Sequence, residues 1–410
     1  MTSSKMRRSA VLVFLLLSAL AAADVSTEFG GHTKFRAVGQ SYPDNSLFRD
    51  YVGPDSLDLG ADLRLNLKLN SGHWTFDSAY QLVGLQGDGL KLSGLPNDDR
   101  RLFNLTDIIS EGSDNAILQR LDRLWVGYTS EKTVIRFGRQ ALSWGNGLAY
   151  APMDLVNPFD PAAIDTEYKV GDDMLYAQYL QDNGNDVQAA YVLRRDPLTG
   201  DVESDKATAA IKYHGFAGEA EYDLLIARSY ADTVIGVGTG RGIGGAVWSA
   251  DLVVTDTDLD TYIQFVTNMM YSWTWGGKNM SGALEYYFNG FGQSGGRYDP
   301  LSLAANPDLL VRISRGELFT LGQHYLSGNL MIEMSPLWSL TPTLLVNIAD
   351  PSALFQLVTS YSLSDNMTLL GSINIPLGPN GSEFGGIESG VPERYLSTDA
   401  GVFAQFAWYF

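Results

Sequence analysis

The sequence predicts an all-β protein, a transmembrane antiparallel β-barrel of about 18 strands, with about 16 strands as the alternative and a long loop folded into the lumen. Three observations predict this class. Segments of about ten residues alternate between apolar and polar side chains, short and long connections alternate along the chain, and aromatic residues gather at one end of the expected strands. Strands with one apolar and one polar face are typical of barrels that cross a membrane, because one face meets lipid and the other a polar lumen.

The first 23 residues are predicted to be a secretory signal peptide. Three basic residues, Lys5, Arg7 and Arg8, precede an apolar run and an A-x-A cleavage site. A membrane anchor would need about 20 apolar residues, which this run does not reach. We therefore expect residues 1–23 to be removed and residues 24–410 to form an outer-membrane β-barrel.

Apolar and polar residues alternate most clearly between residues 56 and 70. Leucine or alanine occupies every second position from Leu57 to Leu69, and mostly Asp, Arg, Asn or Lys lies between them. A period of two is the period of a strand. The same pattern along the chain predicts strands at residues 25–38, 56–69, 74–85, 117–129, 133–141, 174–180, 187–195, 206–214, 219–229, 233–238, 243–255, 262–274, 280–289, 318–334, 339–349, 353–363, 367–376 and 397–410.

The connections between these strands alternate in length. Tight joints are expected at 70–73, 130–132, 181–186, 215–218, 238–242, 275–279, 335–338 and 364–366, and longer segments at 86–116, 142–172, 290–316 and 377–393. Outer-membrane barrels have short turns on one side and long loops on the other. Fusing the first two strands within 219–255 would put the loop at 290–316 on the short-turn side, so the even count is preferred.

The aromatic residues gather at the strand ends where the tight turns are expected. Five tryptophans lie beside expected tight turns or the C-terminus: Trp74, Trp273, Trp275, Trp338 and Trp408. Aromatic side chains at one end of the strands form the interfacial girdle of a membrane barrel, whereas the core of a soluble β-sandwich would favour them at mid-strand. The last strand exposes apolar residues at alternate positions, and its pairing with the first strand would close the edge.

Composition excludes several classes of protein. The chain has no cysteine, and therefore no disulfide framework or thiolate metal site. No later stretch reaches 18 consecutive apolar residues, which excludes helical membrane spans. Subtracting the three basic residues of the signal peptide changes the formal net charge from -19 to -22, and so acidic a surface excludes nucleic acid as a partner. We expect no cofactor and no metal ion.

Short motifs do not indicate an enzyme. Residues 240–245 match a dinucleotide-binding fingerprint by letters, but no βαβ unit surrounds them and a hairpin turn is predicted. Residues 256–260 alternate aspartates like a calcium loop, but Thr261 occupies the position that requires glycine. His324 has the outward parity that a barrel lipase would need, without a sequence-visible partner. We therefore predict that the protein is not an enzyme.

Two stretches resemble those of Gram-negative outer-membrane porins. The terminal strand, in which Phe406, Trp408 and Phe410 share one face, resembles the C-terminal assembly signal that the barrel-assembly machinery recognises. The segment RLWVGYTSEKTVIRFGRQALSWGNG is similar to the porin hairpin in which a strand ending in V-G-L or V-G-Y turns into one ending in L-G-R-Q or F-G-R-Q. The resemblance is to the porin superfamily and to no named subfamily. It implies contact with outer-membrane lipid and lipopolysaccharide, and leaves a monomer and a homotrimer open.

In porins the long loop after that hairpin folds into the barrel and narrows the channel, and the matching loop here is residues 142–172. Prolines prevent regular pairing in this loop, and its apolar residues make free solvation unfavourable. Its carboxylates outnumber Lys169, and Asp154, Asp160, Asp165 and Glu167 are the candidate constriction residues. A lid packed on other external loops is the alternative.

Basic residues of inward parity provide the opposite charge. The candidate pore-wall residues are Lys34, Arg36, Arg64, Lys68 and Arg123, and Arg136 and Arg139 join the constriction. Strict alternation turns Arg139 outward, so the inward position that the porin resemblance implies requires a β-bulge at Gly138. An acidic loop opposite a basic wall would set a transverse field across the pore, with a modest preference for cations. In the alternative interpretation, the charges only hydrate the lumen and pair with one another.

The sequence therefore predicts a porin, a passive diffusion channel for small hydrophilic solutes in the outer membrane of a Gram-negative bacterium. Two features favour this function: enough strands for an open lumen, and a candidate constriction loop. The alternative is a nonconducting outer-membrane barrel for anchoring, adhesion or assembly, in which the lumen would be plugged. The transported solute is left open.

Overall fold

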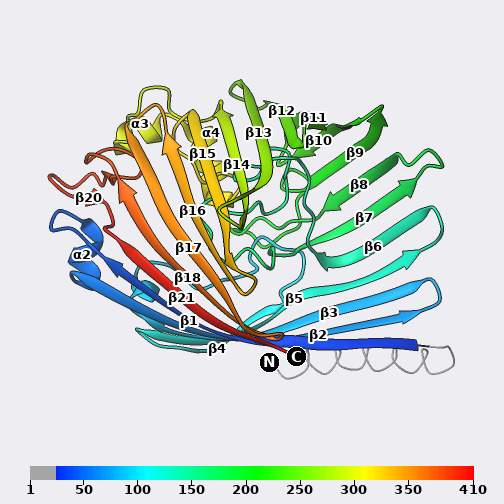
Figure 1. Cartoon of the computed structure of the whole chain (residues 1–410), viewed down its shortest axis with the longest axis horizontal. Coiled ribbons are helices and arrows are strands. Elements are labelled where there is room, and N and C mark those ends of the chain that lie inside the picture. Colours follow the sequence, from blue (N-terminus) through cyan, green and yellow to red (C-terminus); the bar gives the residue numbers. More distant parts are fainter. Residues whose placement is uncertain (1–24) are drawn as a thin grey trace.

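The computed structural model describes residues 25–410, which form a closed antiparallel β-barrel (Figure 1). The predicted signal peptide, residues 1–23, lies outside the described residues. Eighteen strands form the wall: β1 (Val25–Ser41), β2 (Asp55–Ser71), β3 (Trp74–Gly87), β5 (Asn115–Thr129), β6 (Thr133–Gln140), β7 (Asp172–Leu180), β8 (Asp186–Val192), β9 (Thr208–Ala217), β10 (Ala220–Ser229), β11 (Asp232–Ile243), β12 (Ala246–Asp256), β13 (Thr261–Trp275), β14 (Lys278–Asn289), β15 (His324–Ser335), β16 (Trp338–Asn347), β17 (Ser352–Ser364), β18 (Met367–Leu377) and β21 (Gly401–Tyr409).

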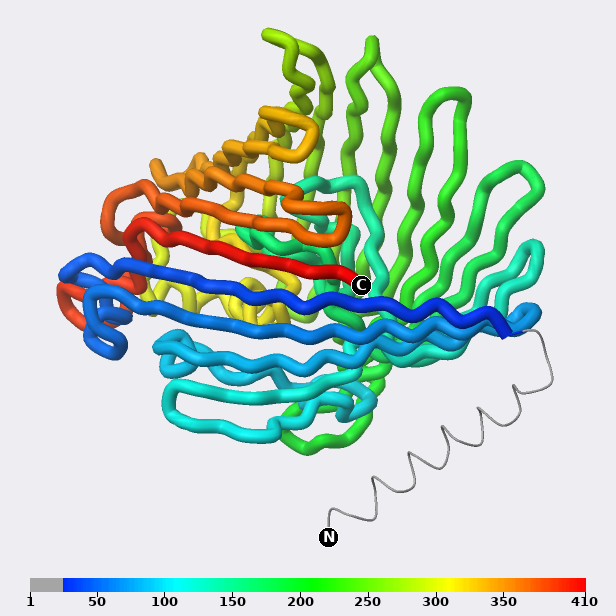
Figure 2. The backbone as a smooth tube through the Cα atoms, turned by 60° about the horizontal axis from the view of Figure 1, so that its bottom comes forward, coloured from blue at the N-terminus to red at the C-terminus, as the bar shows by residue number. Residues whose placement is uncertain are grey.

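The first and last strands close the wall. β1 pairs with β21 from His32 opposite Tyr409 to Gln40 opposite Gly401, and with β2 on its other side. The two strands lie side by side in Figure 2, as the dark blue and red tubes. Closure satisfies the backbone groups of both edges, as a barrel in lipid requires. The prediction of 18 strands is confirmed, and the alternative of 16 is wrong.

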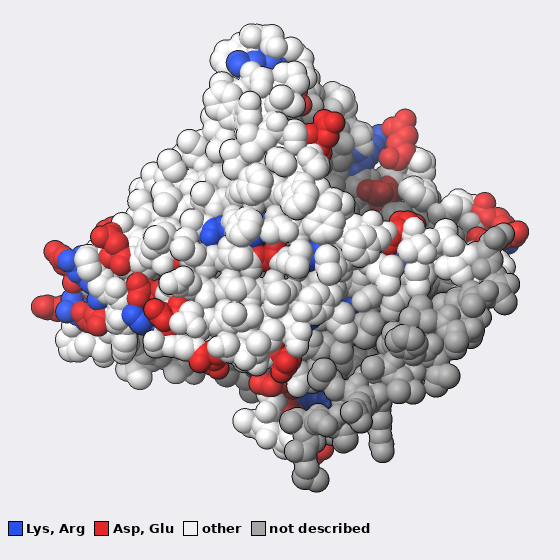
Figure 3. All heavy atoms as spheres, turned by 90° about the horizontal axis from the view of Figure 1, so that it is seen from below, with Lys and Arg blue, Asp and Glu red and all other residues white. Residues whose placement is uncertain are grey.

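The predicted alternation of side chains places apolar residues on the outside of the barrel. On β2, Leu57 is 57% exposed whereas Arg64, of opposite parity, is 2% exposed. On β21, Trp408 is exposed and Gln405 is buried. Charged side chains gather mainly towards the edges of the face shown in Figure 3, and a largely uncharged surface lies between them. Such a surface is costly in water and favourable in lipid. Within residues 25–410, no helix is long and apolar enough to cross a membrane.

The connections differ in length at the two ends of the barrel. At one end, tight turns join β2 to β3, β9 to β10 and β13 to β14, and the exposed Trp74, Trp275 and Trp338 lie beside such turns. The opposite end carries the long loops, with the additional elements α2 (Leu47–Val52), η1 (Asp88–Lys91), β4 (Thr106–Glu111), α3 (Pro300–Ala304), α4 (Pro307–Arg315), β19 (Ile387–Glu388) and β20 (Tyr395–Leu396). β4 extends the sheet by pairing with the outer part of β5.

Some predicted boundaries are wrong. The tight joint expected at residues 238–242 is strand, because β11 continues to Ile243 and the turn lies at Gly244 and Gly245. β15 begins at His324 rather than at residue 318, because the preceding residues pack on the loop after β14, where Gly322 pairs with Gln293. Tertiary contacts, rather than local propensity, set both boundaries.

Candidate functional site

The lumen contains the connection between β6 and β7, residues 141–171, which we call the inner loop. Its Trp144 and Met153 are buried against inward-facing residues of the wall, including Leu225 of β10 and Val253 of β12. The burial of these apolar side chains stabilises the loop inside the barrel. The expectation that a long loop folds into the lumen is therefore met by the structure.

Two inward-facing carboxylates of the wall hold the backbone of the inner loop. Glu285 on β14 accepts hydrogen bonds from the N–H groups of Leu148, Ala149 and Tyr150, at 2.6, 2.9 and 2.9 Å. Asp251 on β12 accepts from the backbone N–H and the side-chain amide of Asn146, both at 2.7 Å. Each carboxylate thus provides acceptors to an irregular backbone segment that has few partners of its own.

The far end of the inner loop contacts the strands where the barrel closes. Lys34 Nζ on β1 lies 2.7 Å from a carboxylate oxygen of Asp165 and 2.7 Å from one of Glu167. Gln405 on β21 donates to Asp165 at 3.0 Å, and Tyr409 donates to Glu167 at 2.8 Å. Burial opposes ionisation of Asp165, but the hydrogen bond and charge of Lys34 outweigh it, so the pKa of this carboxyl is lowered. The loop therefore bridges both strands of the closing seam.

The remaining candidate constriction carboxylates lie in different surroundings. Asp154 is paired with Lys169 Nζ at 2.5 Å, and both side chains are nearly buried. Burial raises the pKa of Asp154 to about 6, although the charge of Lys169 acts in the opposite direction. Asp160 is exposed, and its side chain accepts from the N–H of Ala162. Two lysines thus pair with three of the four carboxylates expected at a constriction.

Most of the candidate wall cations form ion pairs with carboxylates. Arg64 pairs with Asp122 at 2.8 Å, and Arg123 pairs with the same carboxylate at 2.7 Å. Lys68 lies 3.7 Å from Glu28. Arg36 is exposed and Arg136 stacks over aromatic rings; neither has an ion-pair partner within residues 25–410. The electric field across the lumen therefore comes mainly from the few cations, such as Arg36 and Arg136, that have no ion-pair partner in the described part of the chain.

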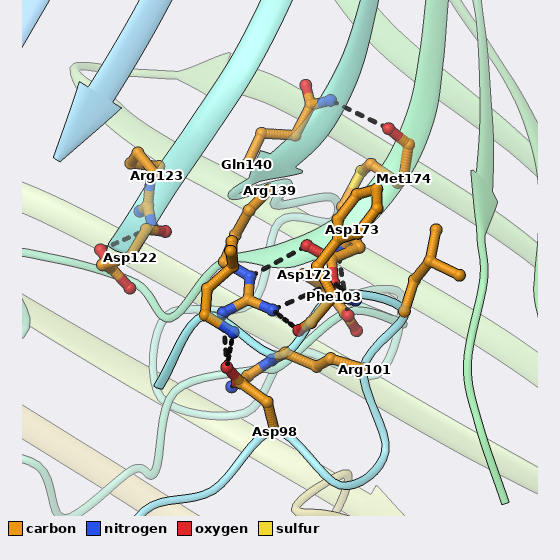
Figure 4. Close-up of polar contacts among 12 residues, drawn as sticks. Asp98, Arg101, Phe103, Asp122, Arg123, Arg139, Gln140, Asp172, Asp173 and Met174 are labelled. Carbon is orange, nitrogen blue, oxygen red and sulfur yellow. Dashed lines mark hydrogen bonds and ion pairs between the residues drawn. The ribbon is translucent and has the colours of Figure 1, made fainter. Parts of the chain in front are cut away.

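Arg139 does not lie free in the lumen. Its guanidinium donates to Asp173 at 2.9 and 3.0 Å, to Asp98 at 3.0 Å and to the carbonyl of Phe103 at 2.6 Å (Figure 4). Gly138 has a φ of 124°, which favours glycine, but the register between β5 and β6 continues through it without a shift. Arg139 thus joins the wall to the loop after β3, and the expected bulge at Gly138 does not occur in the ladder.

Two spaces remain beside the inner loop. A chamber of about 130 Å³, which we call the basic chamber, lies between the loop and strands β1, β2, β3 and β5; His32, Arg36, Asp62, Arg64, Arg120 and Tyr168 are among its lining residues. A second space of about 320 Å³ separates the loop from β14–β17, and Asp160, Ser327, Asn329 and Gln356 contribute to it. Both spaces are large enough to hold several water molecules.

Glu285, Asp251 and Arg120 are not among the residues predicted from the sequence. The two carboxylates have inward parity on apolar strands, a signal that the sequence contains. Arg120 has the opposite parity to Arg123, but the β3–β5 register shifts at Ala79 and Tyr80, which leaves Asp122 as an extra residue in β5. This bulge turns Arg120 inward, where it donates to Gln81 at 2.7 Å. Within residues 25–410, no cluster of three or more His, Asp or Glu side chains could hold a metal ion.

The chain is similar to known proteins in its fold. No family model matches the sequence, and no curated protein matches it. Among solved structures, OccAB4 of Acinetobacter baumannii has a TM-score of 0.53 at 8% identity, covering 94% of this chain and 98% of that one. A BenF-like porin from Pseudomonas fluorescens has a TM-score of 0.50 at 10% identity, covering 94% and 98%. Wzi of Escherichia coli, described as a carbohydrate-binding β-barrel involved in group 1 capsule assembly, has a TM-score of 0.52 at 12% identity, covering 97% and 86%. At these identities the likeness shows that the fold is that of outer-membrane barrels.

Proposed function

We propose that the chain is a porin, a passive channel for small hydrophilic solutes in the outer membrane of a Gram-negative bacterium. The observation that carries this proposal is the inner loop, which crosses the lumen while polar-lined spaces remain on two sides of it. A barrel that served only as an anchor would have no need of an internal loop fixed by carboxylates of the wall. The fold shared with a BenF-like porin supports the same function.

The inner loop would act as the constriction. It reaches from Asn146 at β12 to Asp165 at β1 and β21, so solutes must pass between the loop and the wall. Because Lys34 and Lys169 pair with three of the four loop carboxylates, we propose weak ion selectivity in place of the cation preference that the sequence suggested. The field of the unpaired cations Arg36 and Arg136 acts on nearby solutes but is screened over about 8–10 Å at physiological salt.

A bilayer experiment tests this function. The purified protein should give discrete conductance steps in a planar bilayer, and a variant with residues 155–164 replaced by a short glycine-serine linker should give larger steps. The reversal potential in a salt gradient should lie near zero. A folded protein without conductance, or with steps that the loop deletion leaves unchanged, would contradict the proposal.

A nonconducting barrel is the second candidate. The inner loop contacts the wall on several sides, and Wzi, a carbohydrate-binding β-barrel, shares the fold. A sealed lumen would give no conductance. Retention of the solubilised protein on a column that carries polysaccharide would also favour this candidate over a channel.

Export and assembly complete the proposal. Phe406, Trp408 and Phe410 share the outer face of the last residues, where they can contact lipid. We propose that they form the signal for the barrel-assembly machinery, and that the exposed outer surface contacts outer-membrane lipid and lipopolysaccharide. The state of assembly, monomer or homotrimer, would be decided by the mass of the detergent-solubilised protein.

A further inference from the structure

The basic chamber contains polar groups that no contact in the structure satisfies. His32 on β1 is 1% exposed, and neither of its ring nitrogens has a hydrogen-bond partner within residues 25–410. The Oδ1 atom of Asp62 on β2 is likewise without a partner in that part of the chain. Buried polar atoms normally have partners, so this pair of groups facing one chamber offers a position for a bridging polar atom, of water or of a solute.

The geometry of these groups fits one bridging atom. His32 Nε2 and Asp62 Oδ1 are 3.9 Å apart, which is too far for a direct hydrogen bond. An oxygen atom about 2.8 Å from both fits between them, and a hydroxyl can accept from the imidazole N–H and donate to the carboxylate. The imidazole is held in place by Tyr168 and Tyr409, whose ring centroids lie 5.4 and 5.9 Å from its own.

The charge of the chamber favours an anionic group beside that hydroxyl. Four cations, Lys34, Arg36, Arg64 and Arg120, line the chamber with three carboxylates, and neither Arg36 nor Arg120 has an ion-pair partner within residues 25–410. Gln81 connects Asp62 with Arg120, since it donates to Asp62 at 3.1 Å and accepts from Arg120 at 2.7 Å. An added Cβ at Gly60 would lie 2.5 Å from Nε of Arg36, so the glycine allows this arginine to lie close to the wall.

We propose that the basic chamber binds a small α-hydroxy acid during its passage through the barrel, with the carboxylate at Arg36 and Arg120 and the hydroxyl between His32 and Asp62. The excess of cations disfavours a second positive charge, and therefore favours a hydroxyl over an ammonium group at the bridging position. This inference names a solute class for the proposed channel and therefore rests on that function. The volume of about 130 Å³ suits a solute of a few heavy atoms.

Three solutes that share one carbon skeleton test the proposal. Lactate has a hydroxyl, alanine an ammonium and propionate neither, and their binding to the full-length protein in detergent can be measured by calorimetry. Lactate should bind at least about tenfold more tightly than propionate, because the hydroxyl satisfies two buried groups. Equal binding of lactate and propionate would leave only attraction of anions and would overturn the proposal. Tighter binding of alanine, or no binding of lactate, would also overturn it.

Variants locate the site. His32→Phe retains the ring packing and should reduce the preference for lactate over propionate to about one. Arg36→Ala, at an exposed position, should weaken the binding of both anions about tenfold. Lys132→Ala removes a cation that pairs with Asp182 at the tight turns, outside the chamber, and should change neither. Binding needs no conductance, so a protein that binds lactate without conducting would contradict the channel and leave the site intact. A conducting protein without lactate preference would contradict the site alone.

Discussion

Replacement of Glu285 by alanine should release the inner loop while the barrel remains folded. This side chain accepts the N–H groups of Leu148, Ala149 and Tyr150 and is 2% exposed. A hydrogen bond to a charged group contributes about 1.5–3 kcal/mol, so three independent bonds would contribute about 5–9 kcal/mol. They share one carboxylate, and water replaces part of the loss, so we expect docking of the loop to weaken by about 3–5 kcal/mol.

Such a loss would increase the population of the released loop by about two to four orders of magnitude. Limited proteolysis measures this directly, because Lys169 is the single trypsin site within residues 141–171 and is 6% exposed in the docked loop. Cleavage after Lys169 should be faster in Glu285→Ala, and channel current should become noisier. Glu285→Gln, which retains an acceptor, should have a smaller effect.

Glu333→Gln provides the matched control. Glu333 lies on β15 and accepts from Asn279 rather than from the inner loop, so its loss should leave cleavage at Lys169 unchanged. The temperature at which the folded barrel loses its characteristic gel mobility should be similar in all three variants, because the wall is intact. If Glu285→Ala leaves Lys169 as protected as in the unchanged protein, the anchoring role of Glu285 is refuted.

Three further predictions concern the rim and the wall. Arg139→Ala should leave the carboxylate of Asp173 without an ion pair and that of Asp98 with Arg101 alone, and should cost about 3–5 kcal/mol, seen as a lower heat-modification temperature; an unchanged temperature would contradict this. Burial raises the pKa of Glu383 to about 7, above its ordinary value of 4.5, so its contribution to docking of the loop after β18 is full below pH 4.5 and is lost as the pH rises through about 7. Protection factors of the amides at 378–386, corrected for the intrinsic exchange rate at each pH, should therefore be smaller at pH 8 than at pH 5.5, and Glu383→Gln should remove the difference. Replacing the aromatics at 406, 408 and 410 by serine should reduce folded barrel in the outer membrane, and normal levels would exclude an assembly signal there.

The wall of the barrel could be predicted because the sequence of each strand reflects the environments of its two faces, the lipid and the lumen. Lipid and lumen impose opposite preferences on successive residues, and this period of two appears in short segments such as 57–69 without knowledge of the rest. Each of the 18 predicted strands overlaps one strand of the wall, although some boundaries differ by several residues.

The glycine-rich β11 shows why one boundary was wrong. Gly236 and Gly238 resemble turn residues, but they lie on the inner face of a strand. An added Cβ at Gly236 would lie 3.3 Å from Met153, and one at Gly238 would lie 2.9 Å from the side-chain amide of Asn146. These glycines make room for the inner loop, so their role depends on a segment about 90 residues earlier in the chain, which local reading cannot reveal.

The helices of the long loop after β14 could have been predicted. α3 and α4 each begin with proline after a residue whose side chain caps the helix, Asp299 and Asn306, and Gly316 ends α4 in the left-handed conformation. This is a common pattern of helix start and stop signals. The partners of Arg139 were not predictable in the same way, because Asp98 lies in an irregular segment whose position depends on the whole rim.

The bridge from Asp165 to Lys34 on β1 and Gln405 on β21 bears on the order of assembly. The chain delivers these two strands from its opposite ends, and the bridge can form only when both are in place. The contacts of Asp165 with both strands are therefore completed only when the barrel has closed. A chain that closed with the loop outside would lack this internal bridge between its first and last strands.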